Sequence, residues 1–175
     1  MLGFCFFKRK LYIATSHQSK IMTLDTLEDL YKYLPDEKPD FVVTPGGPYP
    51  FTILRILLST ANGFARGHNI PCHLIKRFDF LNFVCPGHFF ALETRRGDFF
   101  TYYEKTGEAM MTKEDVLAFV RQHHIPLVSD ADVLSEFAEE ITINLAEKLI
   151  EYYPHATILK EPYYLYTPQY KKARP

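Results

Sequence analysis

The 175-residue sequence predicts an α/β fold with mixed sheets, arranged as two small lobes. Short apolar runs typical of strands alternate along the chain with segments of helical periodicity. Two of the apolar regions carry a turn signal at their centre, which indicates antiparallel hairpins within the sheets. We expect residues 1–76 to form an N-terminal lobe and residues 77–175 to form a C-terminal lobe.

The N-terminal lobe begins with a hairpin, because GFCFF and LYIAT are apolar and flank a basic turn. TLDTLEDLYKYL follows as a helix, since its apolar side chains share one face and Asp25 with Glu28 has the spacing of a capping box. FVVT is a short buried strand, and IPCHLI is the next strand. Between them, a helix runs from about Phe51 to Arg66 and ends at Gly67.

A second hairpin opens the C-terminal lobe, because two apolar segments flank TRRGD, a turn that contains Gly97. TKEDVLAFVRQHH is an amphipathic helix with Thr112 as its N-cap. IPLVSD forms a strand, and ADVLSEFAEE and INLAEKLIEYY form two further helices. EPYYLYTP closes the lobe as an extended segment.

Charge and cysteine usage exclude several classes of protein. The formal net charge of −1 gives no bulk attraction to nucleic acid or to an anionic membrane. The sequence has only three cysteines, and an odd number cannot all pair with one another, so a disulfide framework is not expected. This cysteine usage favours a reducing compartment. The N-terminus lacks the pattern of a secretory signal, and no apolar run approaches membrane-spanning length. We therefore expect a cytoplasmic protein.

No catalytic or metal-binding pattern stands out. Cys72, His73, Cys85 and His88 include no C-x-x-C pair, and neighbouring side chains on a strand point to opposite faces. The sequence also lacks G-x-S-x-G and H-E-x-x-H. We therefore expect no catalytic residue, no metal and no cofactor.

A basic turn offers one alternative, contact with RNA. Arg95 and Arg96 are expected at a hairpin tip with Phe99, Tyr102 and Tyr103 beyond them, and this mixture of basic and aromatic residues suits phosphate and base contacts. Alternating aromatics on a hairpin are more often core on one face and ordinary surface on the other.

The helix over residues 51–66 is apolar on two sides. One arc consists of Phe51, Leu54, Leu58, Ala61 and Ala65, and the adjacent arc consists of Ile53, Ile56, Leu57 and Phe64. One arc suffices to pack a helix on a sheet, so something else covers the second. A neighbouring helix of this chain, TLEDLYKYL, and a partner subunit are both consistent with this pattern.

Four segments resemble, in order and spacing, the motifs of one protein family. GGPYPFTILR is similar to the GxGPGSFTGxR signature of the bacterial TsaB family, also called YeaZ, and ANGFARGHNIP is similar to its continuation. ALETRRGDFF resembles the DARRGEVY hairpin of that family, and EPYYLYTPQYKK resembles its C-terminal P-x-Y-L-R segment. The resemblance spans nearly the whole chain.

The resemblance implies an actin-like, hexokinase-like ATPase fold of the ribonuclease H-like type. Family members take part in threonylcarbamoyladenosine synthesis on tRNA without carrying out the chemistry themselves. They pair through two helices with a catalytic homologue, TsaD, and an ATP-hydrolysing protein, TsaE, docks onto the pair. They also self-pair through the same helical surface. This implies a non-catalytic scaffold subunit with indirect tRNA contact and no membrane association.

The family's motif residues map onto definite positions of this sequence. Its loop-and-helix motif falls on Gly47, Pro48, Phe51, Thr52 and Arg55, and continues through Ala61, Gly63 and Ala65. Its hairpin turn falls on Arg95, Arg96 and Gly97, and its tail motif falls on Pro162, Tyr164 and Leu165.

Several positions depart from the family. The family begins with a strand that carries a D-T-S motif, whereas this chain starts at what resembles the next hairpin, so we expect a fold truncated at the first strand. A loop glycine and a serine are replaced by Tyr49 and Pro50, and two helix glycines by Ile53 and Leu57. Because the prolines lack N–H groups and Tyr49 is bulky, the GGPYP loop is a turn that leads into the helix and not a phosphate cradle.

We expect the partner interface on the two helices of the N-terminal lobe. Its residues are Leu27, Leu30, Tyr31, Leu34, Ile53, Ile56, Leu57, Thr60 and Phe64. Leu57→Glu is then expected to abolish pairing while the monomer stays folded. The alternatives are a divergent homodimeric adaptor that has lost this partner, and an ATP-binding enzyme in its own right.

Overall fold

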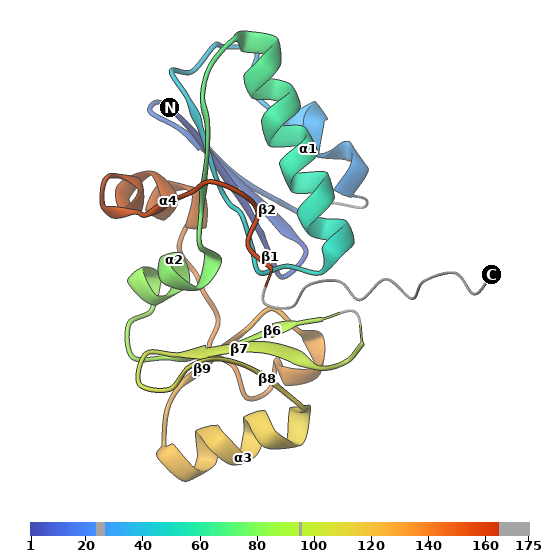
Figure 1. Ribbon diagram of the computed structural model, residues 1–175, viewed down its shortest axis with the longest axis vertical. Helices are drawn as coiled ribbons and strands as arrows, with labels where there is room; N and C mark the ends of the chain where they lie inside the picture. Colours follow the sequence, from blue (N-terminus) through green and yellow to red (C-terminus); the bar gives the residue numbers. More distant parts are fainter. Residues whose placement is uncertain (24–26, 95, 165–175) are drawn as a thin grey trace, which may run out of the picture.

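The computed structural model describes residues 1–23, 27–94 and 96–164, and two sheets dominate it (Figure 1). The six-stranded sheet has the order β10-β5-β4-β1-β2-β3, and the four-stranded sheet has the order β8-β7-β6-β9. The first sheet comprises β1 (Leu2–Phe7), β2 (Lys10–Thr15), β3 (Ser19–Thr23), β4 (Val42–Pro45), β5 (Cys72–Ile75) and β10 (Ile158–Leu159). The second comprises β6 (Phe89–Glu93), β7 (Phe99–Tyr103), β8 (Gly107–Met111) and β9 (Leu127–Ser129).

The first predicted hairpin is confirmed. β1 and β2 pair antiparallel with Phe7 opposite Lys10, so the connection has only two residues. Those residues, Lys8 and Arg9, both have positive φ, as a two-residue turn between twisted strands requires. The meander continues into β3, which the sequence did not predict because SKIMT is mostly exposed and lacks a clear apolar alternation.

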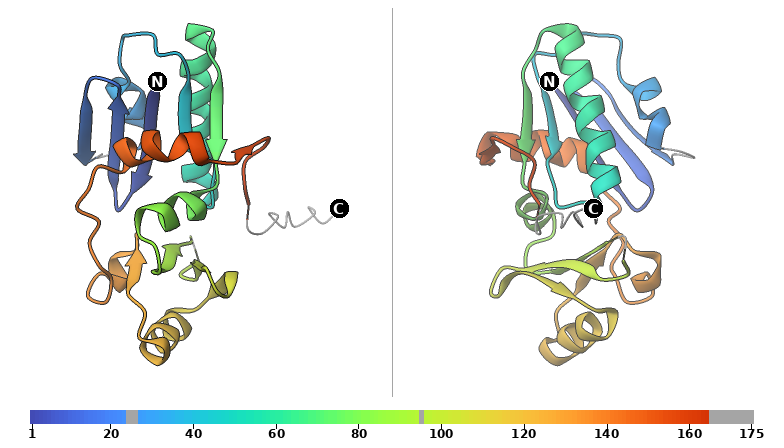
Figure 2. Two further views of the ribbon diagram at one scale, coloured as in Figure 1. Left: turned by 90° about the vertical axis from the view of Figure 1, so that its left-hand side faces the viewer. Right: turned by 45° about the vertical axis from the view of Figure 1, so that its right-hand side comes forward.

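Helices cover both faces of the first sheet (Figures 1 and 2). α1 (Phe51–His68) lies on one face beside a 3-10 helix, η1 (Leu27–Tyr33), and α4 (Leu145–Tyr152) crosses the other face. The α1 prediction is confirmed, but the helix passes through Gly67 and ends where Asn69 adopts a left-handed conformation. The helix predicted in TLDTLEDLYKYL is a 3-10 helix from Leu27, and its predicted capping box begins at Asp25, outside the described residues.

The second sheet has α2 (Arg77–Val84) on the side toward the first sheet and α3 (Lys113–His123) on the other (Figure 1). The predicted hairpin around TRRGD forms β6 and β7, and Thr112 accepts a hydrogen bond from the Asp115 amide as the predicted N-cap of α3. The helix predicted in ADVLSEFAEE is reduced to one 3-10 turn, η2 (Asp132–Leu134), and a further 3-10 turn, η3 (Tyr153–His155), follows α4.

The two sheets repeat one plan. In each, three antiparallel strands are followed by a helical segment and then by a strand parallel to the first of the three: β4 pairs parallel with β1, and β9 with β6. Ligands of open α/β sheets bind where the carboxyl ends of parallel strands meet. In this chain those ends converge on the seam between the two sheets, where Arg77 contacts the residues that follow β4 and β9.

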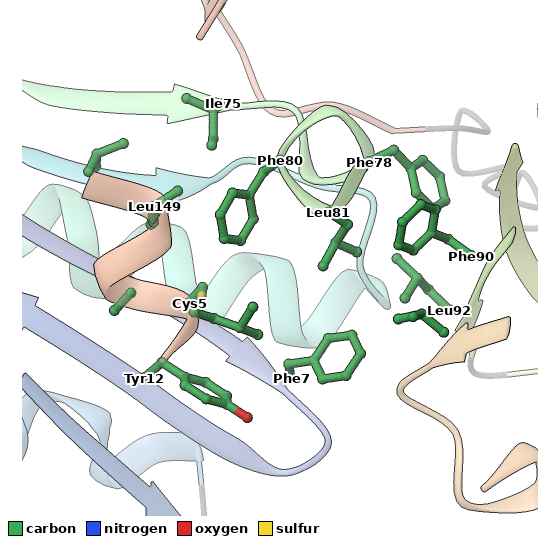
Figure 3. Packing of buried hydrophobic residues seen from close by; sticks show 14 of the residues in the cluster. Cys5, Phe7, Tyr12, Ile75, Phe78, Phe80, Leu81, Phe90, Leu92 and Leu149 are labelled. Carbon is green, nitrogen blue, oxygen red and sulfur yellow. The ribbon is translucent and has the colours of Figure 1, made fainter. Parts of the chain in front are cut away.

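One apolar cluster crosses that seam (Figure 3). Phe7 from β1, Phe78 and Leu81 from α2, and Phe90 and Leu92 from β6 all belong to it, and each is 2% exposed or less. Two other clusters lie between α1 and the first sheet and between α3 and the second sheet. Because the seam cluster contains side chains from both sheets, the lobes share a core.

The chain returns to the first sheet at its C-terminal end. α4 packs on β1 and β2, and β10 pairs with β5 at the sheet edge. A division of the chain at residue 76 therefore leaves α4 and β10 in the C-terminal part, although they belong to the layers of the first sheet.

α4 approaches β1 closely at Gly3, which yields a prediction. A Cβ at Gly3 would lie 3.1 Å from both the Ala146 carbonyl oxygen and Ile150 Cγ1. We expect Gly3→Val to lower the free energy of unfolding by about 1–3 kcal/mol through overpacking, measured by urea denaturation. Gly67→Ala is the control, since a Cβ there meets nothing within 4 Å, and the exposed helix should gain up to about 1 kcal/mol. Equal stabilities of the two variants would contradict this packing.

Candidate functional site

A groove of about 610 Å³ runs between α1 and the residues of η1 and the loop after it. Three small residues, Ser59, Gly63 and Gly67, follow one another at four-residue spacing along its α1 side. Its other lining residues are Tyr31, Leu34, Pro35, Asp36, Thr60, Phe64 and His68. Because no large side chain projects from the small residues, another chain segment can approach the backbone of α1 closely.

Four of the predicted interface residues line this groove: Tyr31, Leu34, Thr60 and Phe64. Tyr31 is 64% exposed, the highest value among the large apolar side chains of the described residues. Ile53 and Ile56 are half-buried and lie outside the groove lining. Leu27 begins η1, but its side chain lies outside the described residues.

Leu30 and Leu57 correct the predicted interface, because both side chains are fully buried within the monomer. They belong to one cluster with the buried face of α1 and the first sheet. The helical periodicity predicted the face of α1 on which Leu57 lies, but it did not predict what packs against that face. In the structure η1 and the first sheet cover Leu57. The expectation that Leu57→Glu leaves the monomer folded is therefore wrong, since the variant would bury an unpaired charge.

The seam between the sheets holds a buried guanidinium. Arg77, 2% exposed, donates to Asp130 Oδ2 at 2.8 Å and to the Pro48 carbonyl at 3.2 Å. Asp130 follows β9 and also accepts a hydrogen bond from the Glu93 amide at 2.7 Å. The sequence patterns did not predict this pair, whose members are 53 residues apart. The available signal was an arginine inside the apolar run LIKRFDFLNF, where a cation needs a partner.

Tyr49 completes this seam. The Arg77 guanidinium lies 3.8 Å from the centre of its ring, and its hydroxyl donates to the Phe6 carbonyl at 3.2 Å. Burial raises the pKa of Tyr49, although the charge of Arg77 acts in the opposite direction, so the hydroxyl remains a donor. Tyr49 therefore fills space between the sheets.

The space left in the seam is small. No space that admits a water molecule remains among Cys5, Phe7, Tyr49, Arg77 and their neighbours, whereas ordinary small-molecule sites have volumes of roughly 300–1,000 Å³. Burial raises the pKa of the Cys5 thiol to about 12, with Arg77 acting in the opposite direction. A protonated thiol at this position is a poor nucleophile.

Two residues of the motif that resembles the TsaB signature, Phe51 and Thr52, line a second hollow of about 410 Å³ at the start of α1. Its lining combines Phe51 and Thr52 with Glu93 and Thr94 from the end of β6. Burial and the charges of Asp130 and Asp132 raise the pKa of Glu93. A carboxyl group in the wall of this hollow disfavours a phosphate ligand.

Three further motif residues lie near this hollow or the seam. Gly47 and Pro48 form the loop over Arg77, and Arg55 on α1 holds its guanidinium 5.4 Å from the centre of the Phe51 ring. Arg96 is exposed, Gly97 has a φ of 85°, and Arg95 lies outside the described residues.

The aromatic residues beyond the basic turn do not form an exposed set. Phe99 is 1% exposed and Tyr103 is 8% exposed, and both pack in the core of the second sheet. Tyr102 is half-buried and stacks on Phe78. The aromatic part of the alternative RNA interpretation is therefore corrected, because the alternation of the strand turns these rings inward.

Among residues 1–23, 27–94 and 96–164, no three His, Cys, Asp or Glu side chains gather closely enough to hold a metal ion. No helix in those ranges has the length and apolar character to cross a membrane. The cysteines Cys5, Cys72 and Cys85 are free thiols.

Similarity to known proteins is structural. No protein-family model matches the sequence, and no curated protein matches it either. The chain is similar to a crystal structure of an uncharacterized Pseudomonas aeruginosa protein with similarity to peptidase YEAZ, with a TM-score of 0.57 and 14% identity over 94% of this chain and 98% of that one. It is also similar to YeaZ from Pseudomonas aeruginosa, with a TM-score of 0.55 and the same identity and coverage. At this identity the likeness shows a shared, YeaZ-like α/β fold.

The expected truncation at the first strand is not supported. β1 lies between β4 and β2 at the centre of its sheet, and the alignments cover 98% of both neighbours. Leu2–Phe7 is therefore itself the central strand, which carries FCFF and no D-T-S motif. A short apolar run before a basic turn has the same pattern in either hairpin position, so the sequence did not distinguish them.

The buried ion pair yields a prediction. We expect Arg77→Met to lower the free energy of unfolding by about 3–5 kcal/mol, because it leaves the Asp130 carboxylate and the Pro48 carbonyl without their buried donor. Urea denaturation measures the loss, and Arg66→Met, at an exposed position of α1, serves as control. In a double-mutant cycle with Asp130→Asn, additive effects would show that the two side chains are not coupled.

Proposed function

We propose that this protein is a non-catalytic, TsaB-like scaffold subunit. In this role it pairs with a TsaD-like catalytic protein in the transfer of a threonylcarbamoyl group to tRNA adenosine. A TsaE-like ATPase docks onto the pair, and contact with tRNA is indirect. The proposal includes an actin-like ATPase fold without nucleotide binding, and a cytoplasmic location supported by three free thiols.

The observation that carries the proposal is the contrast between a filled seam and an open groove. The seam, where the carboxyl ends of the parallel strands meet, is occupied by Arg77, Tyr49 and apolar side chains. The groove beside α1, in contrast, combines apolar walls with small residues. A filled seam favours a subunit that does not turn over nucleotide, and the groove gives a partner helix close access to α1.

The groove suits one helix of a partner subunit. Phe64 and Tyr31 supply aromatic area on its two sides, and the Phe64 ring lies 4.4 Å from that of His68. Gly63 has open space where a Cβ would stand. The interface is therefore centred on Tyr31, Thr60 and Phe64 and not on Leu57. A homodimer through the same groove is the second candidate, since a second copy of α1 presents the same small residues.

Gly63 supplies a test that spares the monomer. Gly63→Glu puts a large charged side chain into the groove, while glutamate is a better helix former than glycine. We expect binding to a purified TsaD-like protein from the same organism, measured by calorimetry, to weaken at least about tenfold, the effect of one like-charge or steric clash at an interface core. Asn62→Glu is the matched control, because Asn62 is exposed on α1 and lies outside the groove.

The outcomes separate the candidates. Weakened binding by Gly63→Glu alone supports the heterodimer, and equal binding by both variants contradicts the groove as the interface. If neither wild type nor variant binds the TsaD-like protein, light scattering decides whether a homodimer is present and whether Gly63→Glu dissociates it.

The enzyme alternative has its own test. We expect titration of the isolated chain with ATP and Mg²⁺ to give no binding heat, because the seam is filled and Glu93 faces the hollow beside it. Saturable binding of ATP by the wild-type chain would overturn the proposed absence of nucleotide binding and favour the enzyme alternative.

A further inference from the structure

The last described segment of the chain, residues 158–164, runs back across the molecule, and we call it the strap. It begins with Ile158 and Leu159, which pair with Ile75 and Leu74 as β10. It then descends from the edge of the first sheet toward the level where the two sheets meet (Figure 1). The proposed function uses none of these residues, although the sequence analysis singled out part of this segment as a family-like motif.

Tyr163 fixes the strap to both sheets. Its amide donates to the Gly46 carbonyl at 2.8 Å, in the loop after β4 of the first sheet. Its hydroxyl donates to Glu108 Oε2 on β8 of the second sheet. The Lys76 ammonium lies 4.8 Å from the centre of its ring and forms an ion pair with Glu108. One side chain and its amide thus connect the β4–α1 loop, the start of α2 and β8.

This cluster is sheltered from solvent. The Glu108 side chain is 12% exposed and the Lys76 side chain 27% exposed, so both are partly desolvated. Burial, the hydrogen bond to Glu108 and its negative charge raise the pKa of Tyr163, which keeps the hydroxyl protonated as a donor. A charge-assisted hydrogen bond in such a setting is stronger than one at the surface.

The loop beneath the strap is built to receive it. Gly47 has a φ of 121°, and a Cβ there would overlap the Tyr163 carbonyl oxygen. The opposite side of the same loop accepts hydrogen bonds from Arg77, whose amide donates to the Gly47 carbonyl at 2.6 Å and whose guanidinium donates to the Pro48 carbonyl. The loop therefore lies between Tyr163 and the ion pair that spans the seam.

We infer that the strap is a latch that holds the two sheets closed over their shared core, with Tyr163 as the residue that fastens it. Its displacement breaks the hydrogen bond between Tyr163 and Glu108, which leaves Glu108 paired with Lys76, and it removes the support of the Gly46–Pro48 loop over Arg77. The seam then opens at its Arg77–Asp130 edge. The inference concerns this chain alone and does not require the proposed partner.

Cys5 is a built-in reporter of this opening. Its side chain is 2% exposed and lies in the seam with Phe7, Tyr49 and Arg77. Because burial shields the thiol and raises its pKa, iodoacetamide reacts with it only when the seam opens. Peptide mass spectrometry separates its modification from that of Cys72 and Cys85.

The test compares two neighbouring tyrosines of the strap. We expect Tyr163→Ala to accelerate alkylation of Cys5 by about tenfold or more in native buffer, the factor that corresponds to the loss of one hydrogen bond to a charged group. Tyr164→Ala is the matched control, because Tyr164 is exposed and its recorded ring neighbour is Phe51, at 6.2 Å. Equal rates for the two variants would overturn the inference.

Two further measurements separate opening from unfolding. Opening of the seam exposes far less surface than unfolding does, so the alkylation rate of Cys5 in Tyr163→Ala should depend only weakly on urea. The amides that pair β1, β2 and β3 should also keep their protection from hydrogen exchange. If the alkylation rate of Cys5 rises only as much as the loss in the free energy of unfolding accounts for, the latch is overturned. If Tyr163→Ala does not fold, Tyr163→Phe keeps the ring under Lys76 and removes only the hydroxyl. A rise in the Cys5 rate then supports the latch, and an unchanged rate overturns it.

Discussion

The structure depends on the counter-charge and hydrogen-bond acceptors that one buried cation, Arg77, finds between the two sheets. A guanidinium that is removed from water needs both a counter-charge and enough acceptors, and Asp130 and the carbonyls of Pro48 and Phe6 supply them. These acceptors come from different elements: the ends of β1 and β9 and the loop after β4. The position of each element is therefore constrained by the needs of one side chain. The apolar residues of α2 on the same helix then close the core around it.

This arrangement accounts for the state of the seam. Two sheets of the same plan present the carboxyl ends of their strands to each other, which is the usual position for a ligand in such folds. Here Arg77 provides the positive charge, and the ring of Tyr49 lies against it. The protein's own side chains thus occupy the position, and the sheets form one body with a continuous core. The groove beside α1 stays open, with a volume of about 610 Å³.

Sequence reasoning predicted the elements whose signals are local. The turn at Lys8 and Arg9, the cap at Thr112 and the start of α1 depend on residues within a few positions of one another. α2 was missed because it is short and buried on several sides, so its apolar residues show no helical stripe. The burial of Leu57 and the Arg77–Asp130 pair were missed for a different reason. Both depend on which distant segment packs there, and one sequence does not contain that information.

The glycines of α1 have a thermodynamic consequence for the free protein. Gly63 and Gly67 lie inside an exposed helix face, where each costs about 1 kcal/mol relative to alanine. No contact within the described chain requires them, since a Cβ at either position would meet open space. A ligand bound in the groove would stabilise the folded chain by mass action, by an amount that rises with the logarithm of the ratio between its concentration and its dissociation constant. The lifetime of the folded chain in the cell would then follow the supply of that ligand.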